Sequence, residues 1–305
     1  MSIISFTELK KRVNNLKFVF TTVKSIREHL EVVFVFGMAS DDTLKSNRAK
    51  FLTYINAHRT PFNFITIEAL YNDLKAYSSN KKGVTAQRIA LVDLELRAIK
   101  QAHSLIIFPE SAGSYAELGY FTAIEETKQK MYIANDYAYS DQESYLNHLI
   151  DVIHNTRTLR PLFLDFNHVG IPEDRFDRLI ENLAKDYEAN RQVHKFVNSL
   201  LFPLAITYEL IRLLPFLTYT QLQIATEMIL DTFSDIRYDT KDFTVNISML
   251  VVSGLIIRQE VEENIYFLPV DENYEFISFS LSERDRVHLM ALEIEYSEDK
   301  KRLRQ

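Results

Sequence analysis

Two glutamates near the middle of the chain have the residue type and the spacing for chemistry on a sugar. The segment Leu105–Gly119 is predicted as a short apolar strand, a tight loop and a helix, with Glu110 just past the strand and Glu117 in the helix. Cleavage of a glycosidic or N-glycosidic bond passes through an oxocarbenium-like state. One carboxylate beside the anomeric carbon stabilises or attacks that state, and a second group handles protons. This segment can therefore hold the two carboxylates of such a site.

A structural interpretation of the same residues stands beside the chemical one. Ser114-Tyr-Ala-Glu117 fits the S-x-x-E capping box, with Ser114 as the N-cap and Glu117 closing back onto it. Gly113 permits a sharp turn or the close approach of a ligand. A helix start at the carboxyl end of a strand also offers free N–H groups to an anion. Both interpretations remain open at the level of sequence.

The elements around this segment predict a parallel sheet. Apolar runs rich in β-branched and aromatic residues predict strands, and 3.6-residue periodicity predicts helices between them. The predicted strands are 31–36, 62–67, 104–108, 130–134 and 162–166; the predicted helices are 5–30, 42–57, 86–101 and 114–127. Such alternation is typical of an α/β, Rossmann-like, mainly parallel sheet with flanking helices. Ligands of these sheets bind at the carboxyl ends of the strands, which singles out the loops Gly37–Asp42 and Pro109–Ser114.

The pattern changes after residue 170. Helices are predicted over 172–184, 191–216, 220–232 and 244–253, and a strand pair over 255–259 and 264–269. Two helices followed by a strand pair are typical of a winged helix. The predicted organisation is an N-terminal helix (1–30), the α/β domain (31–170), an α-helical connector (171–216), a winged-helix domain (217–275) and a charged helical tail (276–305).

The motif order resembles a known family. Val32–Gly37, Glu95, Phe108-Pro-Glu-Ser111 and the G-S-x-x-E-L-G run of Gly113–Gly119 are similar to the segments of nucleoside 2-deoxyribosyltransferase-like proteins. The closest likeness is to the retron-associated effector proteins, which join such a domain to a C-terminal winged helix. Met38 departs from the pattern, since a second small residue often stands there.

The resemblance implies roles for particular residues. Glu117 is the implied catalytic carboxylate, and Glu110 is the implied catalytic partner that positions the base or sugar. Glu95 is the implied supporting acid, with Asp93 as its near alternative. The implied substrate-binding set is Gly37, Met38, Ser40, Asp41, Asp93, Glu95, Gly113, Ser114 and Tyr115.

Three of these positions also have ordinary structural interpretations. Asp93 and Glu95 can equally form a solvated helix face. Tyr115 can stack on a base or lie in the core. Outside this set, Arg48 can meet a phosphate or form a surface pair with Asp41 or Asp42.

Composition excludes several classes of site. The 305 residues contain no cysteine, which removes disulfides, thiol nucleophiles and thiolate metal sites, and only 6 glycines, with no glycine-rich phosphate loop. The eight histidines form no HxxxH or HExxH motif, so no metal or other cofactor is expected. Residues 171–305 hold 15 Lys+Arg against 24 Asp+Glu, which disfavours autonomous binding to nucleic acid. No apolar run is long enough for a membrane span and no signal peptide is evident, so a soluble, cytoplasmic protein without membrane contact is expected.

Two classes of function follow. The first is an enzyme: a toxin effector of a retron anti-phage defence system that cleaves the N-glycosidic bond of a nucleotide, with NAD as the favoured substrate. A deoxyribosyl transferase is the same site with another acceptor. The resemblance implies a retron reverse transcriptase with its RNA–DNA hybrid as partner, and a homo-oligomer is left open. The second is a nucleotide-sensing or winged-helix regulatory protein without catalysis.

Overall fold

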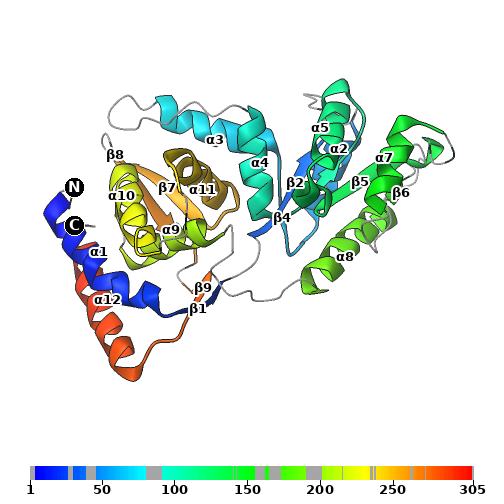
Figure 1. Cartoon of the computed structure of the whole chain (residues 1–305). Coiled ribbons are helices and arrows are strands. Elements are labelled where there is room, and N and C mark those ends of the chain that lie inside the picture. Colours follow the sequence, from blue (N-terminus) through cyan, green and yellow to red (C-terminus); the bar gives the residue numbers. More distant parts are fainter. Residues whose placement is uncertain are drawn as a thin grey trace. The chain divides into compact units, whose positions relative to one another are not determined.

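The chain forms two compact units (Figure 1). The computed structural model describes residues 4–26, 30–38, 46–79, 91–139, 141, 143–154, 162–164, 173–189, 201–214, 216–233, 236, 238–261, 264–271 and 273–303. Unit 1 comprises residues 1–28, 70–94 and 192–305, and unit 2 comprises residues 29–69 and 95–191. No described helix is both long and apolar enough to cross a membrane.

Unit 2 is built on a parallel sheet, as the alternating pattern predicts. Its strand order is β3-β2-β4-β5-β6, with β2 (Leu30–Phe36), β3 (Asn63–Ile65), β4 (Ala102–Ile107), β5 (Met131–Asp136) and β6 (Leu162–Leu164). In the register, Phe34 of β2 lies between Ile65 of β3 and Leu105 of β4. The chain leaves β2 in one direction for β3 and returns on the other side for β4. In α/β sheets, ligands commonly bind at such a reversal, at the carboxyl ends of the strands, and the two predicted loops begin at these ends of β2 and β4.

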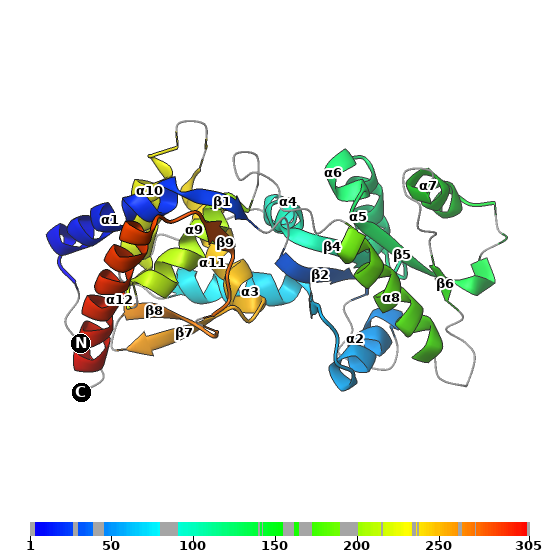
Figure 2. The ribbon, with the colours of Figure 1, turned by 90° about the horizontal axis from the view of Figure 1, so that it is seen from below.

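Helices cover both faces of this sheet (Figure 2). Helices α2 (Asn47–Ala57) and α8 (Glu173–Ala189) pack on one face, where they share a buried apolar cluster with alternate residues of β2, β4 and β5. On the other face lies α5 (Ala112–Thr122), whose Phe121 contacts Phe36 edge-to-face at 5.2 Å between ring centroids. Because β2 is buried on both faces, its sequence is a continuous apolar run rather than an alternating one.

The aromatic centre of the first cluster is Phe51 of α2, which has no exposed surface. Its ring contacts Phe64, Phe108 and Phe176, at centroid separations of 5.3, 5.6 and 5.1 Å. These three rings come from the end of β3, the end of β4 and helix α8. Phe51 therefore fixes α2 against the same strand ends from which the candidate loops leave.

Several helices of unit 2 differ from the prediction. The helix predicted over 114–127 is two helices, α5 and α6 (Glu125–Lys128), and α7 (Tyr145–His154) was not predicted. Helix α3 (Ile67–Ser79), also unpredicted, begins directly after β3, and α4 (Leu91–Gln101) leads into β4. Both α3 and α4 contribute residues to each of the two units.

Unit 1 gathers segments that are far apart in the sequence. Helix α9 (Phe202–Leu213) is almost wholly buried and packs against α10 (Tyr219–Leu230) and α11 (Thr240–Val252). The antiparallel hairpin of β7 (Ile256–Val261) and β8 (Asn264–Pro269) follows. This order is the one that the winged-helix prediction requires, and the domain type itself stays a prediction.

The N-terminal helix is shorter than predicted. Helix α1 (Phe6–Thr21) starts at the N-cap Ser5, and the chain then forms β1 (Val23–Ile26) instead of continuing as helix to residue 30. Strand β1 pairs antiparallel with β9 (Ile277–Phe279), just before the long helix α12 (Glu283–Leu303). The tail helix was predicted, but this pairing was not, because neither short strand has an alternating pattern of its own.

Phe51→Ala should destabilise unit 2 by about 3–5 kcal/mol, because it removes a fully buried ring with three aromatic neighbours. Urea unfolding followed by circular dichroism measures the change. Tyr145→Ala on α7 is the control: this side chain is 75% exposed, so its removal should change the free energy of unfolding by no more than about 0.5 kcal/mol. Equal effects of the two changes would contradict the packing described.

Candidate active site

The start of helix α5 is capped by two serines. Ser111 is the N-cap and Ser114 closes the capping box, so the interpretation with Ser114 as N-cap and Glu117 as its partner is wrong. The buried Ser114 Oγ accepts hydrogen bonds from the N–H groups of Glu110 at 3.0 Å and Ser111 at 2.9 Å. Ser114 was predicted to bind substrate, but its hydroxyl is engaged in holding the helix start. Glu117 is thereby released from any capping role.

Glu117 projects from α5 with an unused acceptor. Its Oε2 is buried and has no hydrogen-bond partner among the described residues. Burial raises the pKa of Glu117, the nearby charge of Glu68 raises it further, and the Arg48 guanidinium opposes both. A buried carboxylate oxygen that has no hydrogen-bond donor lowers the stability of the folded protein. The same oxygen can accept a hydrogen bond from a ligand.

Glu95 of α4 is a second buried acid within electrostatic reach of Glu117. Its side chain is 5% exposed. Burial, and then the charges of Glu117 and Glu68, raise the pKa of Glu95 to about 7. Because the charge of Glu117 contributes to the raised pKa of Glu95, the two carboxyl groups lie within electrostatic reach of each other, and the supporting role of Glu95 stays a prediction. An acid with this pKa exchanges its proton readily at neutral pH.

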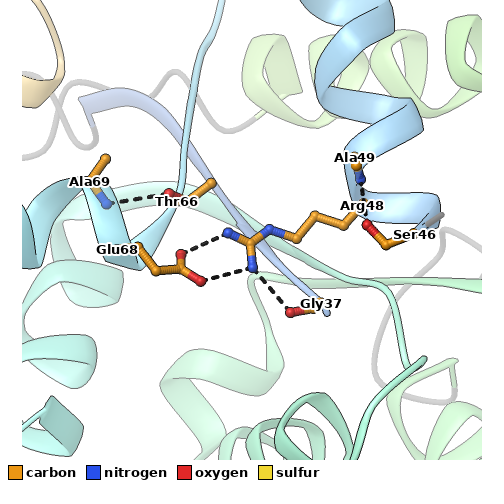
Figure 3. A network of polar contacts seen from close by, with 7 residues as sticks. All are labelled: Gly37, Ser46, Arg48, Ala49, Thr66, Glu68 and Ala69. Carbon is orange, nitrogen blue, oxygen red and sulfur yellow. Dashed lines mark hydrogen bonds and ion pairs between the residues drawn. The ribbon is translucent and has the colours of Figure 1, made fainter. Parts of the chain in front are cut away.

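A buried arginine organises the loops at the strand ends (Figure 3). Arg48 Nη1 and Nη2 bind the two carboxylate oxygens of Glu68 at 3.0 and 2.7 Å. Arg48 Nη1 also donates to the carbonyl oxygen of Gly37 at 3.0 Å. Burial would raise the pKa of Glu68, but the hydrogen bonds from Arg48, aided by the backbone N–H of Glu68, the Arg48 charge and Thr66, hold that pKa below its ordinary value. The lowered pKa of Glu68 favours its ionised form.

Glu110 binds the N-terminus of α2. Its Oε2 accepts the backbone N–H of Asn47 at 2.7 Å, and its Oε1 accepts that of Arg48 at 3.1 Å. Both are orphan donors in the first turn of a helix, and the helix dipole adds to their attraction for a carboxylate. The geometry thus gives Glu110 a structural contact at this helix start, and its predicted contact with a base or sugar stays a prediction.

Gly37 is required where these elements meet. Its φ of 154° lies outside the usual range of other residues, and a Cβ there would approach the Arg48 Cβ to 2.9 Å. Glu110 Oε1 and the Phe108 Cβ would each lie 3.1 Å away. At Gly37, the loops after β2 and β4 and the start of α2 are therefore packed so closely that a methyl group would not fit.

No group of three or more His, Asp or Glu side chains among the described residues is placed to hold a metal ion. The site is instead three acids, Glu68, Glu95 and Glu117, with Arg48 bound to one of them. Such an arrangement can stabilise a developing positive charge and can accept or hold a proton.

Comparison with models of protein families gives a match over most of the chain. The model of the family described as STM3845 retron effector protein matches residues 44–258, more than two thirds of the sequence. This chain belongs to that family. Membership connects the effector with the retron system and with a role in retron defence.

The other comparisons add no functional information about the effector. No curated protein matches it. Among solved structures it is similar to the Orc1 protein of Aeropyrum pernix in complex with DNA, with 12% identity, 97% of this chain and 93% of that chain covered, and a TM-score of 0.19.

The remaining predicted site residues of the effector have different outcomes. Ser40 and Asp41 lie outside the described residues, and Met38 directly follows Gly37. Asp93 belongs to unit 1, where it pairs with Lys241 at 3.7 Å, and its role as an alternative to Glu95 stays a prediction. Residues two apart on a helix point in nearly opposite directions, which separates these two acids.

Gly113 and Tyr115 both lie in the first turns of α5. Gly113 is exposed and helical, so the sharp turn predicted there is absent, and its N–H is among those that a helix start leaves without an intrahelical partner. Tyr115 is 49% exposed, which excludes the core interpretation and leaves base stacking as a prediction.

Sequence reasoning missed Glu68. It follows the predicted strand 62–67 and opens an unpredicted helix, so no motif drew attention to it. The available signal was positional: an acidic residue just past the carboxyl end of a sheet strand, beside the strand that carries Gly37.

Glu95→Gln should reduce the pH dependence of unfolding between about pH 4.5 and 7. The folded state holds the Glu95 proton more tightly than the unfolded state, so this group's contribution is complete below the ordinary glutamate pKa of 4.5 and is lost as the pH rises through about 7. The change should be on the order of 2 kcal/mol, which urea unfolding at several pH values measures. Glu126→Gln, at an exposed position on α6, is the control. A Glu95→Gln profile parallel to that of the wild type would contradict the assignment.

Proposed function

We propose that this retron effector is a toxin that hydrolyses the N-glycosidic bond of a nucleotide, with NAD as the favoured substrate. The observation that carries the proposal is the buried Glu117 Oε2, which has no partner among the described residues and lies in the field of Glu68 and Arg48. Glu117 belongs to the helix that follows β4, beside the reversal of strand order, and α/β sheets commonly bind ligands at such a reversal.

The proposed chemistry assigns one step to each of two acids. The bond between C1′ of the ribose and the ring nitrogen of nicotinamide breaks, and its electron pair leaves with the now neutral nicotinamide. The Glu117 carboxylate stabilises the positive charge that develops at C1′ and O4′. Water then attacks C1′, and Glu95 in its ionised form accepts the proton that the water loses. The products are ADP-ribose, nicotinamide and one proton.

Membership of the retron effector family supports a place for this activity in defence. In the proposal, the retron reverse transcriptase with its RNA–DNA hybrid holds the toxin inactive until phage infection, and the segment with α10, α11 and the β7–β8 hairpin serves as a protein-docking surface. Ile257 and Val270, at and beside the two strands of this hairpin, are 52% and 58% exposed.

Glu117→Gln should lower the rate of NAD hydrolysis by about 10²–10⁴-fold, because the amide cannot stabilise the positive charge. Loss of NAD and release of nicotinamide, followed by chromatography, measure it, and cell survival on expression gives a second readout. Glu126→Gln keeps Glu117 and removes an exposed carboxylate, so it should hydrolyse NAD at the wild-type rate.

Two outcomes count against the proposal. If the purified effector, alone and with its triggered partner, leaves NAD and nucleosides intact, the protein is a binding module and not an enzyme. If activity is found and Glu117→Gln retains it, the catalytic carboxylate is another residue.

A further inference from the structure

Helix α12 packs against α1 within unit 1 and turns its opposite face away from that contact (Figures 1 and 2). The ring of His288 lies 5.0 Å from the ring of Phe18 on α1, and Leu292, about one turn further along α12, is buried. Met290 is two residues from His288 and two from Leu292, so its side chain points in nearly the opposite direction. The face of α12 that holds Met290 therefore points away from α1.

This face carries a row of apolar side chains, the α12 stripe, which consists of Val287, Met290 and Ile294. Their spacing of three and four residues places them one above the other along the helix. They are 64%, 60% and 61% exposed. Single exposed apolar residues are ordinary on a protein surface, but a row with the period of a helix is typical of a face that packs against another element.

The charged residues on the two sides of the α12 stripe follow a definite order. Arg284 and Arg286 precede its centre, and Glu293 and Glu295 follow it. Arg286 and Glu293 are seven residues apart, or about two turns, so they share one flank of the stripe; Arg284 and Glu295, about three turns apart, share the other. Within the described part of the chain, Arg284, Arg286 and Glu295 make no ion pair, and Glu293 approaches Arg212 to 4.0 Å. Each flank thus has a positive and a negative end.

A second copy of α12, turned end for end about Met290, complements this face. The two Met290 side chains then meet at the two-fold axis, and Val287 of each copy lies near Ile294 of the other. Each arginine is about as far before Met290 as a glutamate on the same flank is after it, so the rotation opposes unlike charges on both flanks. A parallel pair would oppose arginine to arginine and glutamate to glutamate.

We propose that two copies of this effector associate through their α12 stripes as an antiparallel, two-fold helix pair. With three apolar side chains from each copy, the contact is smaller than the roughly 800 Å² per partner of a standard interface, so the association is reversible, with a Kd on the order of 10 µM. This inference rests on contacts of unit 1, and the outcome of any test of NAD hydrolysis leaves it unchanged.

Sedimentation velocity of the full-length protein tests the association. Between about 1 and 200 µM, the mass should rise from 35.7 kDa towards twice that value. Met290→Glu places two carboxylates against each other at the axis and should raise the Kd by at least about 30-fold. Val270→Glu is the control, because it makes the same kind of change at a 58% exposed residue outside α12 and should dimerise as the wild type does. Circular dichroism shows that each protein is folded.

Three results of this measurement would overturn the inference. They are a wild type that stays at 35.7 kDa throughout, a folded Met290→Glu protein that dimerises like the wild type, and loss of the dimer in Val270→Glu.

A charge exchange tests the antiparallel direction. Arg284→Glu should weaken the dimer by about 3–10-fold, because it sets like charges against each other on one flank of each copy. Adding Glu295→Arg to the same chain reverses both charges and should restore the Kd to within about twofold of the wild type, since unlike charges again meet. A double variant that is weaker than Arg284→Glu alone would contradict the arrangement.

The absence of cysteine from the sequence allows the contact to be mapped by cross-linking. Met290→Cys should form a disulfide-linked dimer on mild oxidation, because residues at the two-fold axis come within disulfide reach. Val287→Cys and Ile294→Cys should each link poorly alone and should link when the two proteins are mixed. Non-reducing electrophoresis separates the products. Failure of Met290→Cys to link, or efficient linking of Val287→Cys to itself, would exclude the antiparallel pair.

Discussion

The Arg48 guanidinium is the contact on which the arrangement of the site depends. It joins the carbonyl of Gly37 after β2 to the carboxylate of Glu68 after β3. The backbone of the same residue binds Glu110 after β4. One residue at the start of α2 thus ties together the loops of three neighbouring parallel strands. A buried charge is tolerated only when it is paired and hydrogen-bonded, and here each of its partners belongs to a different loop.

These contacts of Arg48 explain why the unfavourable group of Glu68, Glu95 and Glu117 is tolerated in the folded protein. Burial and the charges of Glu117 and Glu68 raise the pKa of Glu95, and Glu117 Oε2 has no hydrogen-bond partner among the described residues. Like charges and burial both work against folding, and the rigid strand ends and the Phe51 cluster offset them. Functional sites commonly retain such strain, because the groups that would relieve it are supplied by the ligand.

Much of the fold could be predicted from the sequence, because buried strands such as β2 are long apolar runs with little ambiguity. The segment of β4 and α5 singled out Glu110 and Glu117 as candidate carboxylates, and the resemblance to a known family implied the catalytic role of Glu117. The helix cap was assigned to the wrong serine, because Ser111 and Ser114 are both good N-caps and only the backbone decides between them. Glu68 could not be found from local pattern, since its role comes from a partner 20 positions earlier in the chain.

The different surroundings of Asp93 and Glu95 show the same limit of prediction from local sequence. The two acids look equivalent in the sequence, but the helix period sends one to Lys241 and the other to the acidic site. The contacts of the two acids therefore differ although their positions in the sequence are nearly equivalent. The spacing of residues in the sequence only narrows the candidates for the supporting acid to Asp93 and Glu95.

The pairing of β1 with β9 has a consequence for how the protein is made. All of unit 2 lies before residue 192, whereas unit 1 needs the first segment of the chain and the last. During synthesis on the ribosome, the domain that carries the acids is therefore complete while α1 and β1 still await the strand that pairs with them. The two segments of unit 1 that are made early, residues 1–28 and 70–94, therefore wait for residues 192–305 before unit 1 can be completed.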